Sequence, residues 1–290
     1  MSETWTVGRL LTWTTDYLKK HGAENPRLDA EVLLAAARNC ERIMLYTAFE
    51  EVVADDLRAK FRDLVKRRAE GTPVAYLVGK REFYSLSLRV TPDVLIPRPE
   101  TEFVVIAALD ALKHSTDPSP QVADVGTGSG AIAIAIAKHA ANCRLIAIDA
   151  SAAALGIARQ NAGDHQVADR IEFVSGDLLA PLPNERTLSV VASNPPYVSE
   201  AEFTQLAPSV REHEPRQALI GGEKGTEIIE RLIPQAAERL TAGGALILEI
   251  SPMIAAAVVE LLAADDRFEG VATSKDLTGQ VRIVQARRRE

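Results

Sequence analysis

The sequence has few cysteines, and this excludes two kinds of site. Its 290 residues include only Cys40 and Cys143, which lie in separate segments without metal-ligand spacing. Neither a disulfide framework nor a zinc site is therefore expected, and both cysteines should be ordinary small apolar side chains. The histidines show no ligand or catalytic-triad spacing either, so no metal site is predicted.

Long apolar runs and an excess of positive charge are also missing. No run approaches the roughly 18 apolar residues of a membrane span, and the polar start from Met1 to Thr4 lacks the pattern of a signal peptide. We therefore expect a cytoplasmic protein with no membrane partner. The formal charge of −7 argues against a sequence-independent grip on nucleic acid, whereas a hydrophobic fraction of 47% is ample for a folded core.

The first seventy or so residues show the apolar spacing of helices. Thr6 can cap a first helix that ends near Gly22, and Pro26 begins a second. A third helix carries apolar residues at i, i+4, i+7 and i+8 from Leu57 and ends before Gly71. We expect residues 1–72 to form a small helical bundle domain.

Residues 73–97 change in character. The segments 74–79 and 83–90 look like short strands, so a β-hairpin that links two domains is expected here. The stretch Ile96-Pro97-Arg98-Pro99-Glu100-Thr101-Glu102 should then form a stiff loop that opens a helix.

From Gln121 onward, strands and helices alternate, which is typical of a parallel sheet covered on both faces. The pattern predicts an α/β domain over residues 98–290 with a seven-stranded, mostly parallel, doubly wound sheet. The expected strands are 122–125, 144–148, 171–174, 188–192, 245–250, a weak one near 270–274, and 282–286. The expected helices are 131–139, 152–161, 226–240 (interrupted or kinked at Pro234) and 253–263.

The segment Asn194-Pro195-Pro196-Tyr197 follows a buried strand, at the edge where open α/β sheets bind ligands. Asn194 offers an amide oxygen, and the two prolines have carbonyl groups but no N–H, so the segment is rich in rigid acceptors. Tyr197 adds a flat face on which a planar group can stack. The residue types suit a substrate that carries a planar NH2 group, although a proline turn after a strand is also common in any fold.

A glycine-rich loop follows the first strand of this domain and precedes a helix, as a nucleotide-binding loop does. It consists of Gly126, Thr127, Gly128, Ser129 and Gly130. The last two glycines are separated by one residue rather than two, which argues against a plain dinucleotide fingerprint.

Two further strand ends carry carboxylates. Asp149 ends the second strand and can accept hydrogen bonds from ribose hydroxyl groups, and Asp177 with Leu178 follows the third, where an adenine amine could be bound. Because these strand ends meet at one edge of the sheet, we expect a nucleoside site formed with the glycine-rich loop and Asn194.

In this order, the motifs resemble those of class I S-adenosylmethionine-dependent methyltransferases, which have a Rossmann-like fold. More closely, nearly the whole chain is similar to the family of release factor glutamine methyltransferases. The further matching stretches are Tyr76-Leu77-Val78-Gly79, Glu82-Phe83-Tyr84, the segment from Ile96 to Glu102, Glu214-Pro215-Arg216-Gln217-Ala218-Leu219, and Gly221-Gly222.

This resemblance implies S-adenosylmethionine as cofactor and methylation of the side-chain amide nitrogen, N5, of the glutamine in the Gly-Gly-Gln motif of peptide chain release factors. Asn194, Pro195 and Tyr197 would be the catalytic residues and, with Pro196, would bind the glutamine. The helical domain would recognise the release factor, and a monomer with no direct nucleic-acid partner is expected.

Three alternatives remain open on sequence grounds. The substrate could be a glutamine of a ribosomal protein or an adenine N6 in nucleic acid, because the Asn-Pro-Pro-Tyr motif is shared with DNA adenine methyltransferases. The acidic pI disfavours nucleic acid. The domain could also be a module that binds a nucleoside without chemistry, but a pure binder has no need of the Asn194 acceptors.

Overall fold

The computed structural model describes residues 4–115, 117–183 and 187–290. The chain forms two compact units, one made of Met1–Lys80 with Ala207–His213 and the other of Arg81–Leu206 with Glu214–Glu290. Among the described residues, no helix is both long and apolar enough to cross a membrane.

The first unit is a helical bundle. Its helices are α1 (Val7–Lys20), α2 (Pro26–Arg38), α3 (Met44–Thr47), α4 (Asp55–Ala69), α5 (Val74–Val78) and α10 (Pro208–Arg211). Thr6 caps α1 through a hydrogen bond from the Arg9 N–H, as predicted, and Pro26 begins α2. Leu11, Leu33 and Phe61 are among the side chains that bring α1, α2 and α4 into one apolar core.

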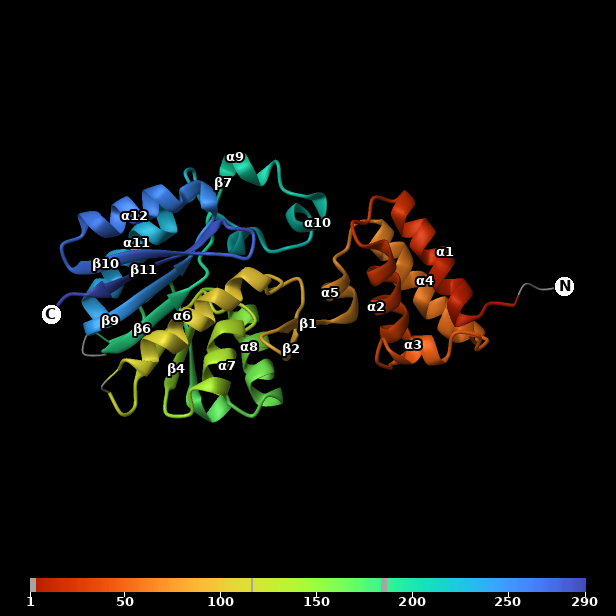
Figure 1. Ribbon diagram of the computed structural model, residues 1–290, viewed down its shortest axis with the longest axis horizontal. Helices are drawn as coiled ribbons and strands as arrows, with labels where there is room; N and C mark the ends of the chain where they lie inside the picture. The colour runs from red at the N-terminus through yellow and green to blue at the C-terminus, as the bar shows by residue number, and fades with distance from the viewer. Residues whose placement is uncertain (1–3, 116, 184–186) are drawn as a thin grey trace. The chain divides into compact units, whose positions relative to one another are not determined.

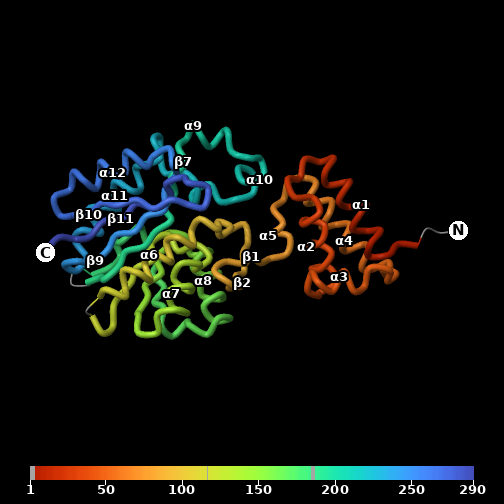
Figure 2. Tube along the Cα trace, in the orientation of Figure 1, coloured from red at the N-terminus to blue at the C-terminus, as the bar shows by residue number. Residues whose placement is uncertain are grey.

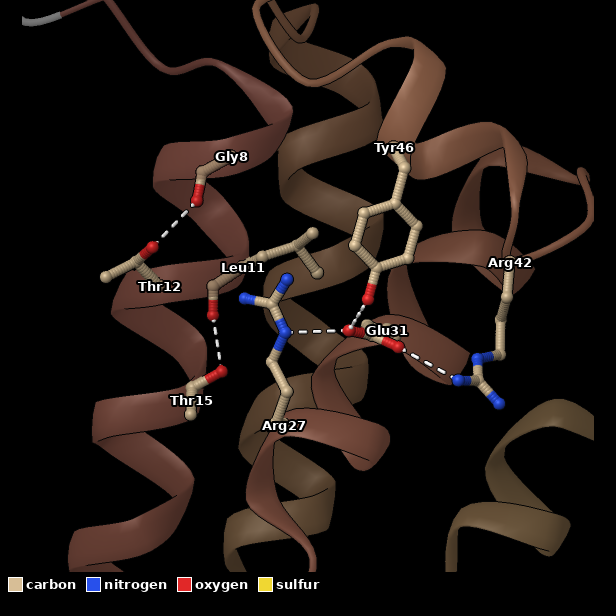
Figure 3. A network of polar contacts seen from close by, with 8 residues as sticks. All are labelled: Gly8, Leu11, Thr12, Thr15, Arg27, Glu31, Arg42 and Tyr46. Atoms are coloured by element: carbon tan, nitrogen blue, oxygen red, sulfur yellow. Dashed lines mark hydrogen bonds and ion pairs between the residues drawn. The ribbon is translucent and has the colours of Figure 1, made fainter.

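Glu31 on α2 is a buried carboxylate in this bundle (Figure 3). It accepts hydrogen bonds from Arg27 (2.7 Å), Arg42 (3.0 Å) and the Tyr46 hydroxyl (2.5 Å). Burial raises the pKa of Glu31, but these three donors outweigh it and hold the pKa below its ordinary value. The network ties α2 to α3, which is too short to be stable by itself.

The predicted strand over 74–79 is wrong, because these residues form helix α5. Pro73 precedes its first turn and Gly79, at φ 72°, ends it in the left-handed region. The hairpin instead consists of β1 (Lys80–Phe83) and β2 (Leu86–Arg89).

Tyr84 and Ser85 join these two strands, and both have positive φ, as a two-residue hairpin turn requires. In Figure 2 the hairpin lies beside α8 (Ala152–Asp164). Asn161 of α8 accepts a hydrogen bond from the Arg89 backbone N–H at 2.7 Å, and His165 bonds to the Ser87 carbonyl at 2.9 Å. The hairpin is therefore attached to the second unit.

The second unit contains the predicted seven-stranded sheet. Its strands are β3 (Gln121–Val125), β4 (Arg144–Asp149), β5 (Ile171–Ser175), β6 (Leu188–Ser193), β9 (Leu240–Glu249), β10 (Phe268–Lys275) and β11 (Val281–Arg288). Their spatial order is β10-β11-β9-β6-β3-β4-β5, with β11 antiparallel to its neighbours and the other pairs parallel. The predicted fold class is confirmed.

Helices cover both faces of this sheet (Figure 1). On one face lie α6 (Glu102–Lys113), α7 (Ala131–His139) and α8, and on the other lie α11 (Glu227–Arg239) and α12 (Ala255–Ala264). Successive strand residues alternate between the two cores: Val190 packs with the first set and Val191 with the second. Helix α11 continues through Pro234, so of the expected interruption or kink, the interruption is wrong.

The chain between β6 and α11 holds short elements that the sequence did not indicate. They are β7 (Val198–Ser199), α9 (Glu200–Phe203) and β8 (Ile220–Gly222), with β7 and β8 paired in parallel. Strand β7 begins directly after Tyr197, so this small sheet anchors one end of the Asn-Pro-Pro-Tyr segment.

Candidate active site

The glycine-rich loop turns sharply between β3 and α7. Gly126, Gly128 and Gly130 all have positive φ, at 73°, 55° and 84°, a region that side chains with a Cβ rarely adopt. The N–H groups of Gly126 and Thr127 both donate to the Ile148 carbonyl at 2.9 Å, which fixes the loop against the end of β4.

Asp124, just before this loop, is fully buried. It accepts hydrogen bonds from the Thr127 hydroxyl (2.6 Å) and from the Ala133 N–H in the first turn of α7 (3.0 Å). Burial raises the pKa of Asp124 to about 6, although those two donors lower it. Its role in the structure is to hold the loop in shape.

Asp149 faces the loop from the end of β4. Its Oδ2 accepts from the Gly128 N–H at 2.9 Å and its Oδ1 from the Ser151 N–H at 2.8 Å, so both oxygens are fixed in direction. Burial raises the pKa of Asp149 against the opposing effect of these N–H groups. Each carboxylate oxygen retains a lone pair, as binding a pair of ribose hydroxyls requires.

Asp177 lies differently. Its side chain is 59% exposed and forms an ion pair with Arg231 of α11. Leu178, the next residue, has a positive φ of 52°. Asp177 and Leu178 therefore follow β5, as predicted. The Asp177 carboxylate, however, pairs with Arg231 and does not contact the glycine-rich loop.

Asn194 follows β6, and its side chain is anchored. Its Nδ2 donates to the hydroxyl oxygen of Thr101 at 3.1 Å. Thr101 is buried at the end of the short 3-10 helix η1 (Pro99–Thr101), within the stiff loop that the sequence predicts. No described residue donates to Asn194 Oδ1, so this oxygen is free to accept from a ligand.

Tyr197, at the other end of the segment, donates its hydroxyl to Glu249 Oε1 at 3.3 Å. Burial raises the pKa of Tyr197 well above its ordinary value, so the hydroxyl stays protonated. Glu249 ends β9 and is 1% exposed. Burial raises its pKa to about 7, while the nearby hydroxyl groups of Thr101 and Tyr197 lower it. Its second oxygen, Oε2, is buried without a hydrogen-bond partner among the described residues.

The backbone behind Pro196 and Tyr197 is packed against glycines. A Cβ built on Gly221 would lie 2.5 Å from the Pro196 carbonyl oxygen, and one on Gly225 would lie 2.5 Å from the Tyr197 carbonyl oxygen. Both distances are far below van der Waals contact. The backbone of the Asn-Pro-Pro-Tyr segment can therefore follow its observed path only with glycine at these two positions.

Arg98 of the stiff loop forms an ion pair with Glu214 at 2.5 Å. The Glu214 side chain is 1% exposed, and its second oxygen accepts from the Ile96 N–H at 3.3 Å. This pair joins two stretches that resemble the methyltransferase family, and it gives Arg98 a structural partner.

The predicted residues that meet are the glycine-rich loop, Asp149 and Asn194. The loop follows β3, Asp149 ends β4 and Asn194 follows β6, and these three strands are adjacent in the sheet. The position of a Cβ on Gly126 lies 4.0 Å from the Asn194 backbone oxygen. Apart from its two chain neighbours, no described residue has a heavy atom within 4 Å of a Cβ position on Gly128, so the loop is open where a ligand could approach. This acceptor-rich, glycine-lined edge fits a nucleoside.

Sequence reasoning missed Thr101 and Glu249 as members of this site. A signal for Glu249 was present, because a lone carboxylate at the end of a buried apolar strand needs a partner. Thr101 lies within the Ile96-to-Glu102 stretch, but nothing in its neighbours indicates a contact with Asn194.

The comparisons with known proteins agree with this fold. The family model for a methyltransferase small domain matches residues 106–212, and the model for the PrmC N-terminal domain matches residues 9–79. A methyltransferase from Pyrococcus furiosus superposes with a TM-score of 0.52 at 19% identity, covering 78% of this chain and 98% of its own, and this shows the fold alone. The matched part of the second unit is thus similar to methyltransferase domains.

Two curated relatives are more specific. The release factor glutamine methyltransferase of Rhodopirellula baltica is 51% identical over 97% of this chain and 95% of its own length. That of Geobacter sulfurreducens is 38% identical over 98% of both. The chain belongs to the release factor glutamine methyltransferase family, and it is an S-adenosylmethionine-dependent enzyme.

Proposed function

We propose that this protein methylates the side-chain nitrogen of the glutamine in the Gly-Gly-Gln motif of peptide chain release factors. The names of its relatives support the substrate. The observation that carries the chemistry is the anchored Asn194, whose Nδ2 is held by Thr101 and whose Oδ1 is left to accept from an amide NH2 group.

An amide nitrogen is a poor nucleophile, because resonance draws its lone pair into the carbonyl group. In the proposed reaction, Asn194 Oδ1 and the Pro195 carbonyl accept the two N–H bonds of the glutamine amide. Tyr197 holds the amide plane against its ring, and Pro196 keeps the backbone rigid. These contacts fix the nitrogen in a reactive position, and good alignment of this kind can lower the barrier by about 7–11 kcal/mol.

The acceptor oxygens also stabilise the positive charge that develops during the reaction. S-adenosylmethionine would, when bound, supply the methyl group of its sulfonium centre. As the new N–C bond forms, the S–C bond to that methyl breaks, the neutral thioether is the leaving group, and positive charge passes to the glutamine nitrogen. Oxygen atoms directed at its N–H bonds bind that charged state better than the neutral amide, so they raise kcat rather than only tightening binding. The nitrogen then loses one proton to water and remains a neutral methylated amide.

For the cofactor, we propose that Asp149 accepts the ribose hydroxyls and that Gly126, Thr127, Gly128, Ser129 and Gly130 receive its amino acid part. Asp177, Leu178 and the Asn194 backbone would complete the site. The Asp149 carboxylate, held by two backbone N–H groups, supports this assignment.

We further propose that residues 1–72 recognise the body of the release factor, that residues 73–97 link the domains, and that residues 98–290 carry the reaction. The protein would act as a monomer in the cytoplasm, where release factors work, without binding nucleic acid directly.

The test is an intact-mass assay of purified release factor with this protein and S-adenosylmethionine, followed by fragment mapping. We expect a gain of one methyl group, about 14 Da by covalent arithmetic, on the Gly-Gly-Gln glutamine. Asn194→Ala should abolish this gain and still bind the cofactor. If no release factor gains mass, a ribosomal protein or an adenine of nucleic acid becomes the substrate to test. If neither of these is methylated, the remaining alternative is a module that binds a nucleoside without chemistry.

A further inference from the structure

Glu249 is a buried carboxyl group beside the Asn-Pro-Pro-Tyr segment, and the proposed reaction does not use it. The residue is 1% exposed. Its Oε1 lies 3.3 Å from the Tyr197 hydroxyl oxygen, and its Oε2 has no hydrogen-bond partner among the described residues. Burying a carboxyl group costs free energy unless it is hydrogen-bonded. The hydrogen bond with Tyr197 is the one that this side chain forms in the described part of the chain, so Tyr197 is the group on which it acts.

The backbone of Glu249 has a fixed place in the sheet. Glu249 is the last residue of β9, which lies between β6 and β11. Leu248 pairs with Ser193 of β6, the residue before Asn194. Glu249 itself pairs with Ile283 of β11. Its main chain is therefore held by two neighbouring strands, at the edge of the sheet where Asn194 lies.

Tyr197 is held at its backbone, but its ring needs a second support. A Cβ on Gly225 would lie 2.5 Å from the Tyr197 carbonyl oxygen, and the next residue, Val198, donates its N–H to the Leu219 carbonyl at 2.9 Å. These contacts fix the main chain, whereas the ring can still turn about two side-chain bonds. A hydrogen bond at the far end of the ring limits its swing about the Cα–Cβ bond.

This contact does not require one protonation state of Glu249. A charged carboxylate accepts the hydroxyl proton of Tyr197, and a neutral carboxylic acid still has acceptor lone pairs on both oxygens. A hydrogen bond can therefore join Tyr197 and Glu249 whether or not the carboxyl group carries a proton.

We propose that Glu249 is a positioning residue that fixes the ring of Tyr197 in the plane against which the substrate amide packs. This inference rests on the proposed function, in which Tyr197 holds the amide plane. A ring that swings about its Cα–Cβ bond would let the amide tilt, and the nitrogen would leave its line of attack on the methyl group. Reaction rates are sensitive to displacements of about 1 Å in a reacting group.

The main test uses Tyr197→Phe, which keeps the ring but loses the hydroxyl, and Glu249→Met, which keeps a similar length but loses the acceptor oxygens. For each we expect kcat on the release factor to fall about tenfold, near the upper end of what one hydrogen bond contributes. The KM for release factor and the Kd for S-adenosylmethionine should change less than about threefold, because the lost groups touch neither molecule in the proposed complex. Glu249→Gln keeps an acceptor oxygen and should recover most of kcat.

The double variant Tyr197→Phe, Glu249→Met shows whether the two residues act through one contact. If they do, its kcat should lie about tenfold below that of the wild type, as in each single variant. A fall of about 100-fold would mean that they act independently and would overturn the inference, and so would wild-type kcat in both single variants. A loss in Glu249→Gln equal to that in Glu249→Met, or a parallel loss of cofactor affinity, would show a merely structural role and would overturn it as well.

A measurement without turnover separates this inference from the proposed function. The chain contains five tyrosines, so labelling the whole protein with ¹³C at the tyrosine ζ carbon gives few resonances. That of Tyr197 is identified by its absence in Tyr197→Phe. In an equal mixture of H2O and D2O, a hydroxyl that exchanges slowly gives separate signals for its OH and OD forms, whereas a rapidly exchanging hydroxyl gives one averaged signal.

We expect separate signals for Tyr197 in the wild type and in Glu249→Gln, and one averaged signal in Glu249→Met. Tyr46, whose hydroxyl is bonded to Glu31 in the first unit, is the internal comparison and should not change. The same Tyr197 pattern in all three proteins would contradict the hydrogen bond, whatever the substrate is. A wild-type enzyme that is inactive on every release factor but keeps the separate signals would refute only the proposed function.

Discussion

Two neighbouring strand ends carry carboxylates with different surroundings, and this difference predicts different roles. Asp149 is held by the N–H groups of Gly128 and Ser151, whereas Asp177 is exposed and paired with Arg231. An asparagine at 149 has only one acceptor oxygen for the two N–H groups and carries no charge.

We therefore expect Asp149→Asn to weaken S-adenosylmethionine binding about 10- to 100-fold, since a hydrogen bond to a charged group contributes about 1.5–3 kcal/mol. Asp177→Asn is the comparison, and it should weaken binding by less than about fivefold because Arg231 already engages that carboxylate. Titration calorimetry measures both affinities. A larger loss for Asp177→Asn would reverse this assignment of the two residues.

Glu249 gives a prediction for the dependence of stability on pH. Burial raises its pKa from 4.5 to about 7 in the folded protein. The folded state then binds this proton more tightly than the unfolded state, so the stabilisation is fully present below pH 4.5 and is lost as the pH rises through 7. The difference between the two pKa values corresponds to about 3 kcal/mol.

Urea unfolding between pH 4.5 and 8 measures this effect. The unfolding free energy of the wild type should fall with rising pH by about 3 kcal/mol more than that of Glu249→Gln, which cannot titrate. Asp124, whose pKa is raised to about 6, and the groups that surround Glu249 (Tyr197, Glu100 and Arg282) are present in both proteins, so their contributions cancel. Parallel curves for the two proteins would show that Glu249 is not buried as described.

At the scale of elements, the β7–β8 pair fixes the Asn-Pro-Pro-Tyr segment from behind. The φ of Gly221 is not in the left-handed region, so its requirement for glycine comes from space alone. A Cβ there would meet the Pro196 and Gly225 carbonyl oxygens at 2.5 and 2.7 Å. These are backbone atoms, and they can move only if the segment moves with them.

Gly221→Ala should therefore destabilise the protein by about 1–3 kcal/mol, the range for overpacking, and should lower kcat because Asn194 shifts. Gly156→Ala is a matched control within the same unit, since Gly156 lies inside α8 with no heavy atom near its Cβ position. It should stabilise the protein by about 0.5–1 kcal/mol and leave kcat unchanged. Thermal unfolding and single-turnover rates measure the two effects, and an active, stable Gly221→Ala enzyme would show that the segment is not held there.

The elements that the sequence did not predict correctly are short and depend on their surroundings. Helix α5 has one β-branched residue at each end and only five residues, so its apolar pattern cannot separate helix from strand. The turn at Tyr84 and Ser85 lacks the glycine or asparagine that usually indicates positive φ. In both places packing overrides local preference.

At the scale of the whole molecule, the regular alternation after Gln121 was enough to predict all seven strands of the sheet. The glycine-rich loop, Asp149 and Asn194 were predictable as one site because they follow parallel strands, whose carboxyl ends share an edge. Thr101 and Glu249 were not, because their contacts with Asn194 and Tyr197 join residues 93 and 52 positions apart in the chain. Such contacts depend on the assembled sheet and not on any local pattern.

Exposed apolar side chains concentrate in the first unit, and this supports a role for it in binding a protein partner. Ile43 is 64% exposed and Val52 is 60% exposed. The other large apolar residues exposed in the described part of this unit are Trp13, Leu28, Met44, Tyr46 and Phe49. A whole release factor could cover these side chains, whereas a short peptide around its Gly-Gly-Gln motif would reach only the active site.

We therefore expect the double variant Ile43→Ser, Val52→Ser to raise KM for a whole release factor about tenfold or more, since covering each apolar side chain contributes about 1–2 kcal/mol. The KM for a short Gly-Gly-Gln peptide, kcat and cofactor affinity should stay unchanged. Leu277→Ser in the second unit is the control, because Leu277 is 97% exposed and lies outside the helical bundle. If the double variant leaves KM for the whole release factor unchanged, or raises it equally for the peptide, the first unit does not recognise the substrate through this part of its surface.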